Sequence, residues 1–259
     1  MKTIAYVDKK VNAKVSRTYD GSLNRMGNFT MLSNLVLYDT QITPIAKLVF
    51  WALAESAKER RFPDGHQTYA TSDSVQTLST KIGISVSSVS RGLRKLRDRE
   101  LILRETAVDG LDALTELLAL DTIYPEYTSK QNQRHYADSL KKAGQYSRLS
   151  NYVCWDSNIS ATAKLVFWGL VSHANGHSLT YADSTPAYGA YPGIKGLSME
   201  TGVSTRGIDR ALVELLSRKL IHRTLWGKKC VARTCLLPIE RIYLDDAAIK
   251  KLPVRGAKK

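Results

Sequence analysis

The hexapeptide AKLVFW occurs twice in this chain, at residues 46–51 and again at residues 163–168. The similarity continues outward: residues 32–53 align without a gap to residues 149–170, and thirteen of these twenty-two positions are identical. Residues 78–102 also align to 197–221, and residues 117–124 to 236–243. An internal repeat of about ninety-five residues is long enough for each copy to bury its own core, so the sequence predicts two domains of one fold.

The residues around the hexapeptide predict a helix at the start of each copy. Thr43 and Pro44 fit the N-cap and the first helical position in the first copy, and Ser160 is the expected cap in the second. The helical period places Lys47 and Lys164 on the outer side of these helices. We expect one aromatic ring of each Phe-Trp pair to be partly exposed, because neighbouring residues point in different directions. Such a ring is a candidate for a contact between domains or between chains.

Two more helices around a tight turn follow in each copy. Gly83 and Gly202 supply the left-handed conformation that ends the first helix, and Ser85 and Ser204 cap the second. The apolar positions of the second helix are Val89, Leu93 and Leu96, matched by Ile208, Leu212 and Leu215. Strand, turn and strand then follow, with turns at residues 109–110 and 226–228. The expected fold class is therefore α+β, mainly helical, with two tandem winged helix-turn-helix domains from an internal duplication.

Basic segments lie outside the two copies. We expect a basic N-terminal arm (1–31), winged-helix domain 1 (32–124), a basic linker (125–148), winged-helix domain 2 (149–243) and a basic C-terminal tail (244–259). The formal net charge of +14 and the pI of about 9.7 indicate a polyanionic partner, most often nucleic acid. The charge is uneven, because the first copy has a net charge of −1 and the second of +5.

Specific stretches carry a resemblance to a known family. The second copy shows ISATAKLVFWGLVSHANGH, GVSTRGIDRAL and SRKLIHR, and the first shows ITPIAKLVFWALAESA, GISVSSVSRGL and DRELILR. Both copies, over most of their length, resemble the winged-helix domains that open many phage and plasmid replication proteins. The resemblance implies a replication initiator that binds repeated origin DNA. Two alternatives stay open: a transcriptional repressor or partition (centromere-binding) protein of a mobile element, and a protein-interaction adaptor.

The candidate DNA contacts lie on the second helix of each pair, because an α-helix fits the major groove with its N-terminal half toward the bases. The predicted DNA-binding residues are Ser87, Ser88, Ser90, Arg91, Arg94 and Lys95 in the first copy, Thr205, Arg206, Asp209 and Arg210 in the second, and Lys228, Lys229 and Arg233 on the second hairpin. The alternative for each is a solvated helix face, or an ion pair such as Arg206 with Asp209. Gly207, inside this helix, could allow a close approach to a phosphate.

The two copies are expected to have unequal roles. The first hairpin carries Asp109, Asp112 and Glu116, which phosphates repel, so we expect it to face away from DNA or to contact protein. Two linked, non-identical DNA-binding domains fit adjacent direct repeats better than a simple palindrome, although a homodimer through the first copy stays open. The expected partners are double-stranded DNA and, as options, a second copy of the chain or replication-machinery proteins.

Other chemistry is not expected from this sequence. His173 and His177 have the spacing of a zinc pair but lack the Glu of an H-E-x-x-H motif, and no Walker loop or G-x-S-x-G is present. Three cysteines, Cys154, Cys230 and Cys235, argue against a disulfide framework and favour a reducing cytoplasm. No apolar run reaches about 18 residues, so we expect no transmembrane helix. The chain is expected to be no enzyme and to need no metal and no cofactor.

Overall fold

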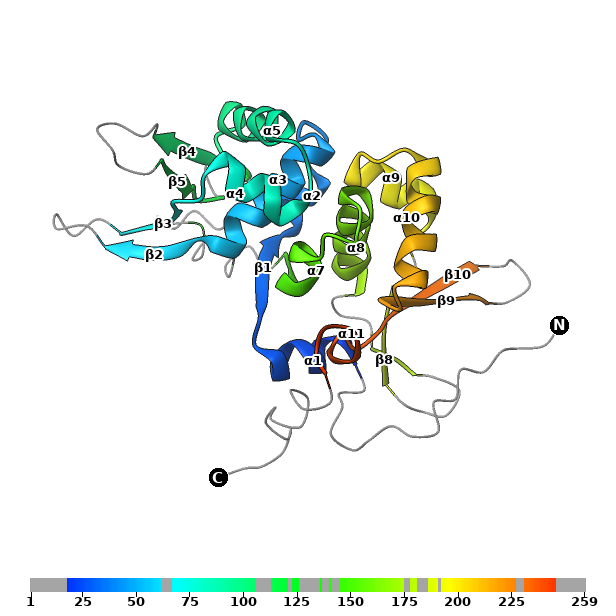
Figure 1. Cartoon of the computed structure of the whole chain (residues 1–259). Helices are drawn as coiled ribbons and strands as arrows, with labels where there is room; N and C mark the ends of the chain where they lie inside the picture. Colours follow the sequence, from blue (N-terminus) through cyan, green and yellow to red (C-terminus); the bar gives the residue numbers. More distant parts are fainter. Residues whose placement is uncertain are drawn as a thin grey trace, which may run out of the picture.

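The computed structural model describes residues 18–61, 67–105, 113–120, 123–125, 136, 140, 145–174, 178–180, 186–190, 192–226 and 231–245. It is an α+β protein with a first half (19–124) and a second half (136–243) (Figure 1). The first half contains α1 (Tyr19–Met26), β1 (Phe29–Ser33), α2 (Asn34–Tyr38), α3 (Pro44–Ser56), β2 (Lys58–Arg61), β3 (Gln67–Thr71), α4 (Val75–Ile82), α5 (Val86–Asp98), β4 (Ile102–Glu105) and β5 (Leu114–Leu117). The second half contains β6 (Tyr146–Ser150), α7 (Asn151–Trp155), α8 (Ala161–Ala174), β7 (Ser178–Thr180), β8 (Pro186–Ala190), α9 (Ile194–Thr201), α10 (Thr205–Ser217), β9 (Ile221–Trp226), β10 (Val231–Leu236) and α11 (Glu240–Tyr243).

Helices α3 and α8 begin where their sequences indicate. The side chain of Thr43 accepts a hydrogen bond from the Ala46 backbone N–H, and Pro44 is the first residue of α3. The side chain of Ser160 accepts a bond from the backbone N–H of Ala163 in α8. Each cap satisfies an N–H group that has no partner within its own helix, so both predicted helix starts are confirmed. None of the helices in the described ranges is both long enough and apolar enough to span a lipid bilayer.

Each half contains a four-stranded antiparallel sheet. The strand orders are β2-β3-β5-β4 in the first half and β7-β8-β10-β9 in the second. The hairpins β4–β5 and β9–β10 lie where the sequence predicts them. The segment after the first long helix of each half forms two strands, β2 and β3 after α3, and β7 and β8 after α8. All four residues of the edge strand β2, Lys58–Arg61, are exposed and charged, which protects the edge from pairing with another chain.

The aromatic pairs of the repeated hexapeptide lie in the centre of the molecule. Phe50, Trp51, Phe167 and Trp168 have no exposed surface, so the expectation that one ring of each pair is partly exposed was wrong. The reason is that the two halves pack against each other, with α3 beside α8 (Figure 1). The Trp51 and Trp168 rings meet edge-to-face at this interface, with centroids 6.4 Å apart and planes inclined by 64°. The expected contact between domains therefore exists, but it is buried.

Lys47 and Lys164 are also fully buried, which corrects their predicted place on the outer side. Each side chain crosses from its own helix into the other half. Lys47 Nζ donates to the Glu200 carbonyl oxygen at 2.6 Å, and Lys164 Nζ donates to the Ile82 carbonyl oxygen at 3.2 Å. The helical period alone places these residues on the polar face, which here is covered by the other half.

Parts of the segments predicted as arm and linker belong to the folded structure. Helix α1, inside residues 1–31, packs on the second half through Tyr19, whose ring lies 5.7 Å from that of Phe167. Arg25 forms an ion pair of 3.2 Å with Glu240 of α11, which lies beside α1 in Figure 1. In the predicted linker, 125–148, strand β6 begins at Tyr146 and pairs with β1, and the Tyr136 ring centroid lies 5.5 Å from that of Phe50. The segment that precedes each copy of the repeat therefore packs against the other half: α1 packs against the second half, and Tyr136 packs against the first.

Candidate nucleic-acid interface

A helix-turn-helix in the first half is formed by α4, a short turn and α5. Gly83 ends α4 with φ of +71°, and its N–H donates to the Ser79 carbonyl oxygen. The Ser79 hydroxyl donates to the Ile84 carbonyl at 2.5 Å and fixes the turn. Ser85 then caps α5 by accepting from the Ser88 N–H. The predicted turn glycine and capping serine are both confirmed.

The second half repeats this geometry with α9 and α10. Gly202 ends α9 with φ of +73°, and the Ser198 hydroxyl donates to the Val203 carbonyl at 2.6 Å. Ser204 caps α10 by accepting from the Gly207 N–H at 3.2 Å. We call α5 and α10 the recognition helices, because they occupy the position that enters the major groove in helix-turn-helix proteins.

The inner faces of the recognition helices are fixed by packing. All six predicted apolar positions are buried: Val89, Leu93, Leu96, Ile208, Leu212 and Leu215. A methyl group added at Gly92 would lie 2.8 Å from Val49 Cγ2, so glycine allows α5 to lie close to α3. The same addition at Gly207 would lie 2.7 Å from Val203 Cγ1. Gly207 therefore faces protein and not a phosphate, which corrects its suggested role.

The outer face of α5 presents most of the residues predicted for the first half. Ser87, Arg91 and Arg94 are exposed, whereas Ser88, Ser90 and Lys95 are partly buried. Arg91 Nη2 donates to Ser88 Oγ at 3.2 Å, so this serine orients the guanidinium as well as closing the capping network. Arg97 is also exposed near the end of α5, and the prediction missed it although it continues the same helical face.

The outer face of α10 has a different chemistry. Thr205, Arg206, Asp209 and Arg210 are all exposed. The alternative ion pair between Arg206 and Asp209 does not form; within the described part of the chain, neither residue has an ion-pair partner. The donors and the acceptor of this face are therefore available to a ligand outside the protein.

The second hairpin is placed only in part. Lys228 and Lys229 lie outside the described residues, as do Asp109 and Asp112 of the first hairpin. Arg233 is on β10 and only 9% exposed, so its side chain is covered within the sheet and offers little surface to a phosphate. This burial argues against the predicted DNA contact of Arg233.

The other candidate chemical groups do not form a reactive site within the described residues. His173 Nε2 lies 2.8 Å from Glu200 Oε2, while His177 is outside the described residues. Within the part of the chain that the structure describes, no group of three potential metal ligands occurs. Cys154 and Cys235 are both buried, and burial raises the pKa of the Cys154 thiol to about 12, which keeps it protonated and unreactive.

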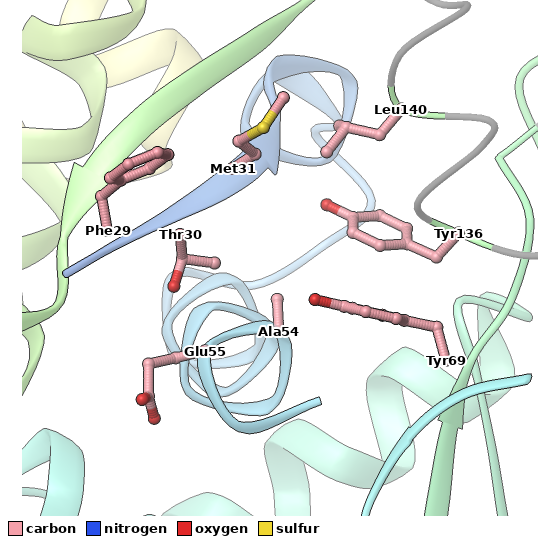
Figure 2. A pocket seen from close by; sticks show the side chains of 8 residues that line it. All are labelled: Phe29, Thr30, Met31, Ala54, Glu55, Tyr69, Tyr136 and Leu140. Carbon is pink, nitrogen blue, oxygen red and sulfur yellow. The ribbon is translucent and has the colours of Figure 1, made fainter. Parts of the chain in front are cut away.

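A pocket lies beside β1 and the end of α3, away from both recognition helices. It is lined by Phe29, Thr30, Met31, Ala54, Glu55, Tyr69, Tyr136 and Leu140 (Figure 2). Its one carboxylate, that of Glu55, is paired with Lys81 Nζ at 2.9 Å. The pocket therefore offers no unpaired charge for a ligand and belongs to the contact between the two halves.

Comparison with known proteins supports the first helix-turn-helix. Residues 40–102 match a family model described as a helix-turn-helix domain. The matched range contains α3, α4 and α5 and ends at the first residue of β4. No curated protein and no solved structure matches the chain. The chain thus contains a helix-turn-helix domain, a type of domain whose partner is DNA.

Proposed function

We propose that this protein binds double-stranded DNA at specific sequences through both recognition helices. The observation that carries the proposal is that α5 and α10 have the same caps, the same buried inner face and an exposed outer face rich in arginine and hydroxyl groups. Arginine can donate two hydrogen bonds to guanine in the major groove, and serine or threonine can contact several bases. The net charge of +14 supports binding to the phosphate backbone.

We further propose that the chain is a duplicated pair of winged-helix domains. The proposal is supported by the sequence repeat, by the common order of helices and by the matching strand orders of the two sheets. In this interpretation residues 32–124 and 149–243 are the two domains, and the segments before them complete the other half. Arg91 and Arg210 occupy equivalent positions and are the leading candidates for base contacts.

The biological role that we propose is replication initiation on a plasmid or phage in the bacterial cytoplasm. Its support is the tandem arrangement, the size and the resemblance to winged-helix domains of replication proteins. A transcriptional repressor or partition protein would use the same residues, so genomic footprinting has to separate these roles. Clustered copies of one site beside an AT-rich stretch would support initiation, whereas a single site that overlaps a promoter would contradict it.

The test of DNA binding uses single arginine substitutions. Arg91→Ala and Arg210→Ala should each weaken binding to the selected site by about 5- to 100-fold, which corresponds to roughly 1–3 kcal/mol. Arg61→Ala removes one charge from the exposed edge strand β2 and is the matched control. Affinities are compared by fluorescence anisotropy at fixed salt. Equal, small effects in all three variants would contradict a role for the helices in base contacts.

The role of the second hairpin is tested by salt dependence. Lys228→Ala with Lys229→Ala should reduce the slope of log affinity against log salt by roughly 2, if both ammonium groups contact phosphates. An unchanged slope would remove this hairpin from the interface. The equivalent hairpin of the first half carries Asp109 and Asp112, so we propose that it stays away from DNA.

A further inference from the structure

The interface between the two halves has the reciprocity of a two-fold axis. In a two-fold interface, a contact from residue i to residue j is accompanied by a contact from j to i. Strands β1 and β6 pair antiparallel with Phe29 opposite Ser150 and Ser33 opposite Tyr146. The sequence alignment pairs position n of the first half with n + 117 of the second, so Met31 and Arg148 are equivalent. These two residues lie opposite each other in the middle of the ladder, which places the axis there.

Side chains around the ladder repeat this reciprocity. Thr30 donates to the Asn151 side-chain oxygen at 2.6 Å, and the equivalent Ser147 donates to the Asn34 side-chain oxygen, also at 2.6 Å. Equivalent ring pairs form on both sides: Tyr19 with Phe167, and Tyr136 with Phe50. The hydroxyl oxygens of both tyrosines accept a backbone N–H, from Ser150 and Ser33 respectively.

The buried lysines and tryptophans extend the same relation to the helices. Lys47 and Lys164 are equivalent. Each donates to a carbonyl oxygen in the last turn of a helix of the other half, Lys47 in α9 and Lys164 in α4. Trp51 contacts its own equivalent, Trp168, as only residues near a two-fold axis can. Helices α2 and α9 are in contact, and so are α7 and α4. The axis therefore relates α5 to α10 through a buried interface.

We infer that one chain binds an imperfect inverted repeat, with α5 on one half-site and α10 on the other; this inference rests on the proposed function. If two domains dock on one duplex in the same way, the half-sites are related by the operation that relates the domains. A two-fold axis produces inverted half-sites, whereas direct half-sites need a translation along the DNA. The inference replaces the expected direct-repeat arrangement within one bound site, while several such sites can still follow one another in tandem.

The half-sites are unequal because the recognition helices differ at equivalent exposed positions. Where α5 has Ser90, α10 has Asp209, an acceptor suited to the amino group of cytosine. Where α5 has Arg94 and Arg97, α10 has Val213 and Leu216, which are 66% and 37% exposed. Apolar side chains in the major groove contact the thymine methyl group. The half-site under α5 should therefore favour guanine, and that under α10 should include cytosine and thymine.

The experiment begins with selection from random duplex DNA by the full-length protein. Three duplexes are then compared: the selected site, the same site with one half inverted to make a direct repeat, and the same site with about half a helical turn inserted between the halves. We expect both altered duplexes to bind at least 10-fold more weakly than the selected site, with one chain per selected duplex by mass photometry. Equal or tighter binding to the direct repeat would overturn the inference and leave the proposed function intact.

Substitutions assign each helix to its half-site. Arg91→Ala should relax base preference in one half of the selected site, and Asp209→Asn should change the preferred base in the other half only. Relaxation of the same half by both variants, or two chains on each duplex, would overturn the inference. Failure of the unaltered protein to bind any duplex at low salt would instead overturn the proposed function.

Discussion

The amino groups of Lys47 and Lys164 end inside the protein, each at the C-terminal end of a helix from the other half. Burying an ammonium group is costly unless it is paired. The C-terminal carbonyls of α9 and α4 provide a partial negative charge and a hydrogen-bond acceptor at these two points. Each ammonium group donates to a carbonyl oxygen that has no partner within its own helix, α9 for Lys47 and α4 for Lys164. This hydrogen bond offsets part of the cost of burying the lysine.

The stability contributed by Lys47 should depend on pH. Burial lowers the pKa of Lys47 from 10.5 to about 8, against the opposing charges of Asp39 and Glu200. The folded protein therefore releases this proton at a lower pH than the unfolded chain does. The free energy of unfolding of the unaltered protein, relative to Lys47→Met, should rise by on the order of 2 kcal/mol between pH 8 and pH 10.

Urea unfolding of both proteins across this pH range measures the effect. Lys58→Met, which replaces an exposed lysine on β2, controls for the loss of one positive charge. A free-energy difference between the unaltered protein and Lys47→Met that stays constant with pH would contradict the buried position of this amino group.

The exposed arginines could be predicted from the sequence, but the buried lysines could not. The two recognition helices are strongly amphipathic, and their polar faces are open to solvent as the helical period indicates. These faces contain Arg91 and Arg94 in α5, and Arg206 and Arg210 in α10. Lys47 follows the same rule in the sequence, yet its face is covered by α9. The period of a helix reports which face is polar, but it contains no information about a second domain that binds that face.

At the scale of elements, the turn between α9 and α10 depends on Gly202. Gly202→Ala should lower stability by about 1–2 kcal/mol, because φ of +73° is unfavourable for a residue with a Cβ atom. Its added methyl would also lie 3.2 Å from Pro44 Cγ of the first half. Gly83→Ala has nearly the same φ with open space around it, so it isolates the backbone cost.

Gly196→Ala is the opposite control, measured by the same thermal unfolding. It lies inside α9, where an added methyl meets nothing within 4 Å, so alanine should stabilise by roughly 0.5–1 kcal/mol. A Gly202→Ala variant as stable as the Gly196→Ala variant would contradict the left-handed conformation of Gly202 between α9 and α10.

Most elements were predictable because their signals are local. Thr43, Ser85, Ser204 and the two turn glycines mark helix ends by side-chain chemistry and backbone freedom alone. Helix α1 was missed, although the sequence contains a signal: YDGSL at 19–23 matches YADSL at 136–140 with the same offset of 117. A match of five residues is too short to indicate that the repeat begins there. The residues that hydrogen-bond to the Tyr19 hydroxyl, Arg148 and Ser150, lie more than 120 residues away in the sequence.

At the scale of the whole molecule, we expect the two halves to unfold together. The Arg25–Glu240 ion pair joins α1 to α11, and the β1–β6 ladder joins the two halves, so each core depends on residues of the other half. Leu23→Ala, in the buried face of α1, should cost about 2–5 kcal/mol and shift the unfolding of helices and of tryptophan fluorescence equally.

Circular dichroism and fluorescence during denaturation test this coupling. Leu103→Ala, at a position that is 49% exposed on β4, should change stability by less than about 0.5 kcal/mol and serves as the control. Two separate transitions in the unaltered protein, or a shift of only one signal in Leu23→Ala, would show that the halves unfold independently.

The arrangement of the halves was the least predictable level. The repeat in the sequence indicates two similar units, but it does not specify how two similar surfaces meet. Residues such as Met31 and Arg148 show their place on the axis only when β1 and β6 are paired. The direct-repeat expectation rested on two linked, non-identical domains, and the sequence does not show that β6 pairs with β1 or that Tyr136 packs against Phe50.

The β1–β6 ladder also affects how site occupancy should respond to the amount of protein. A pair of recognition helices assembled from two separate chains forms by a second-order step, so at low concentration the occupied fraction of a site rises with the square of the protein concentration. Here both helices belong to one chain and are joined by folding alone. When one chain fills one site, occupancy at concentrations well below Kd rises in simple proportion to the number of molecules, and doubling the gene dose doubles it.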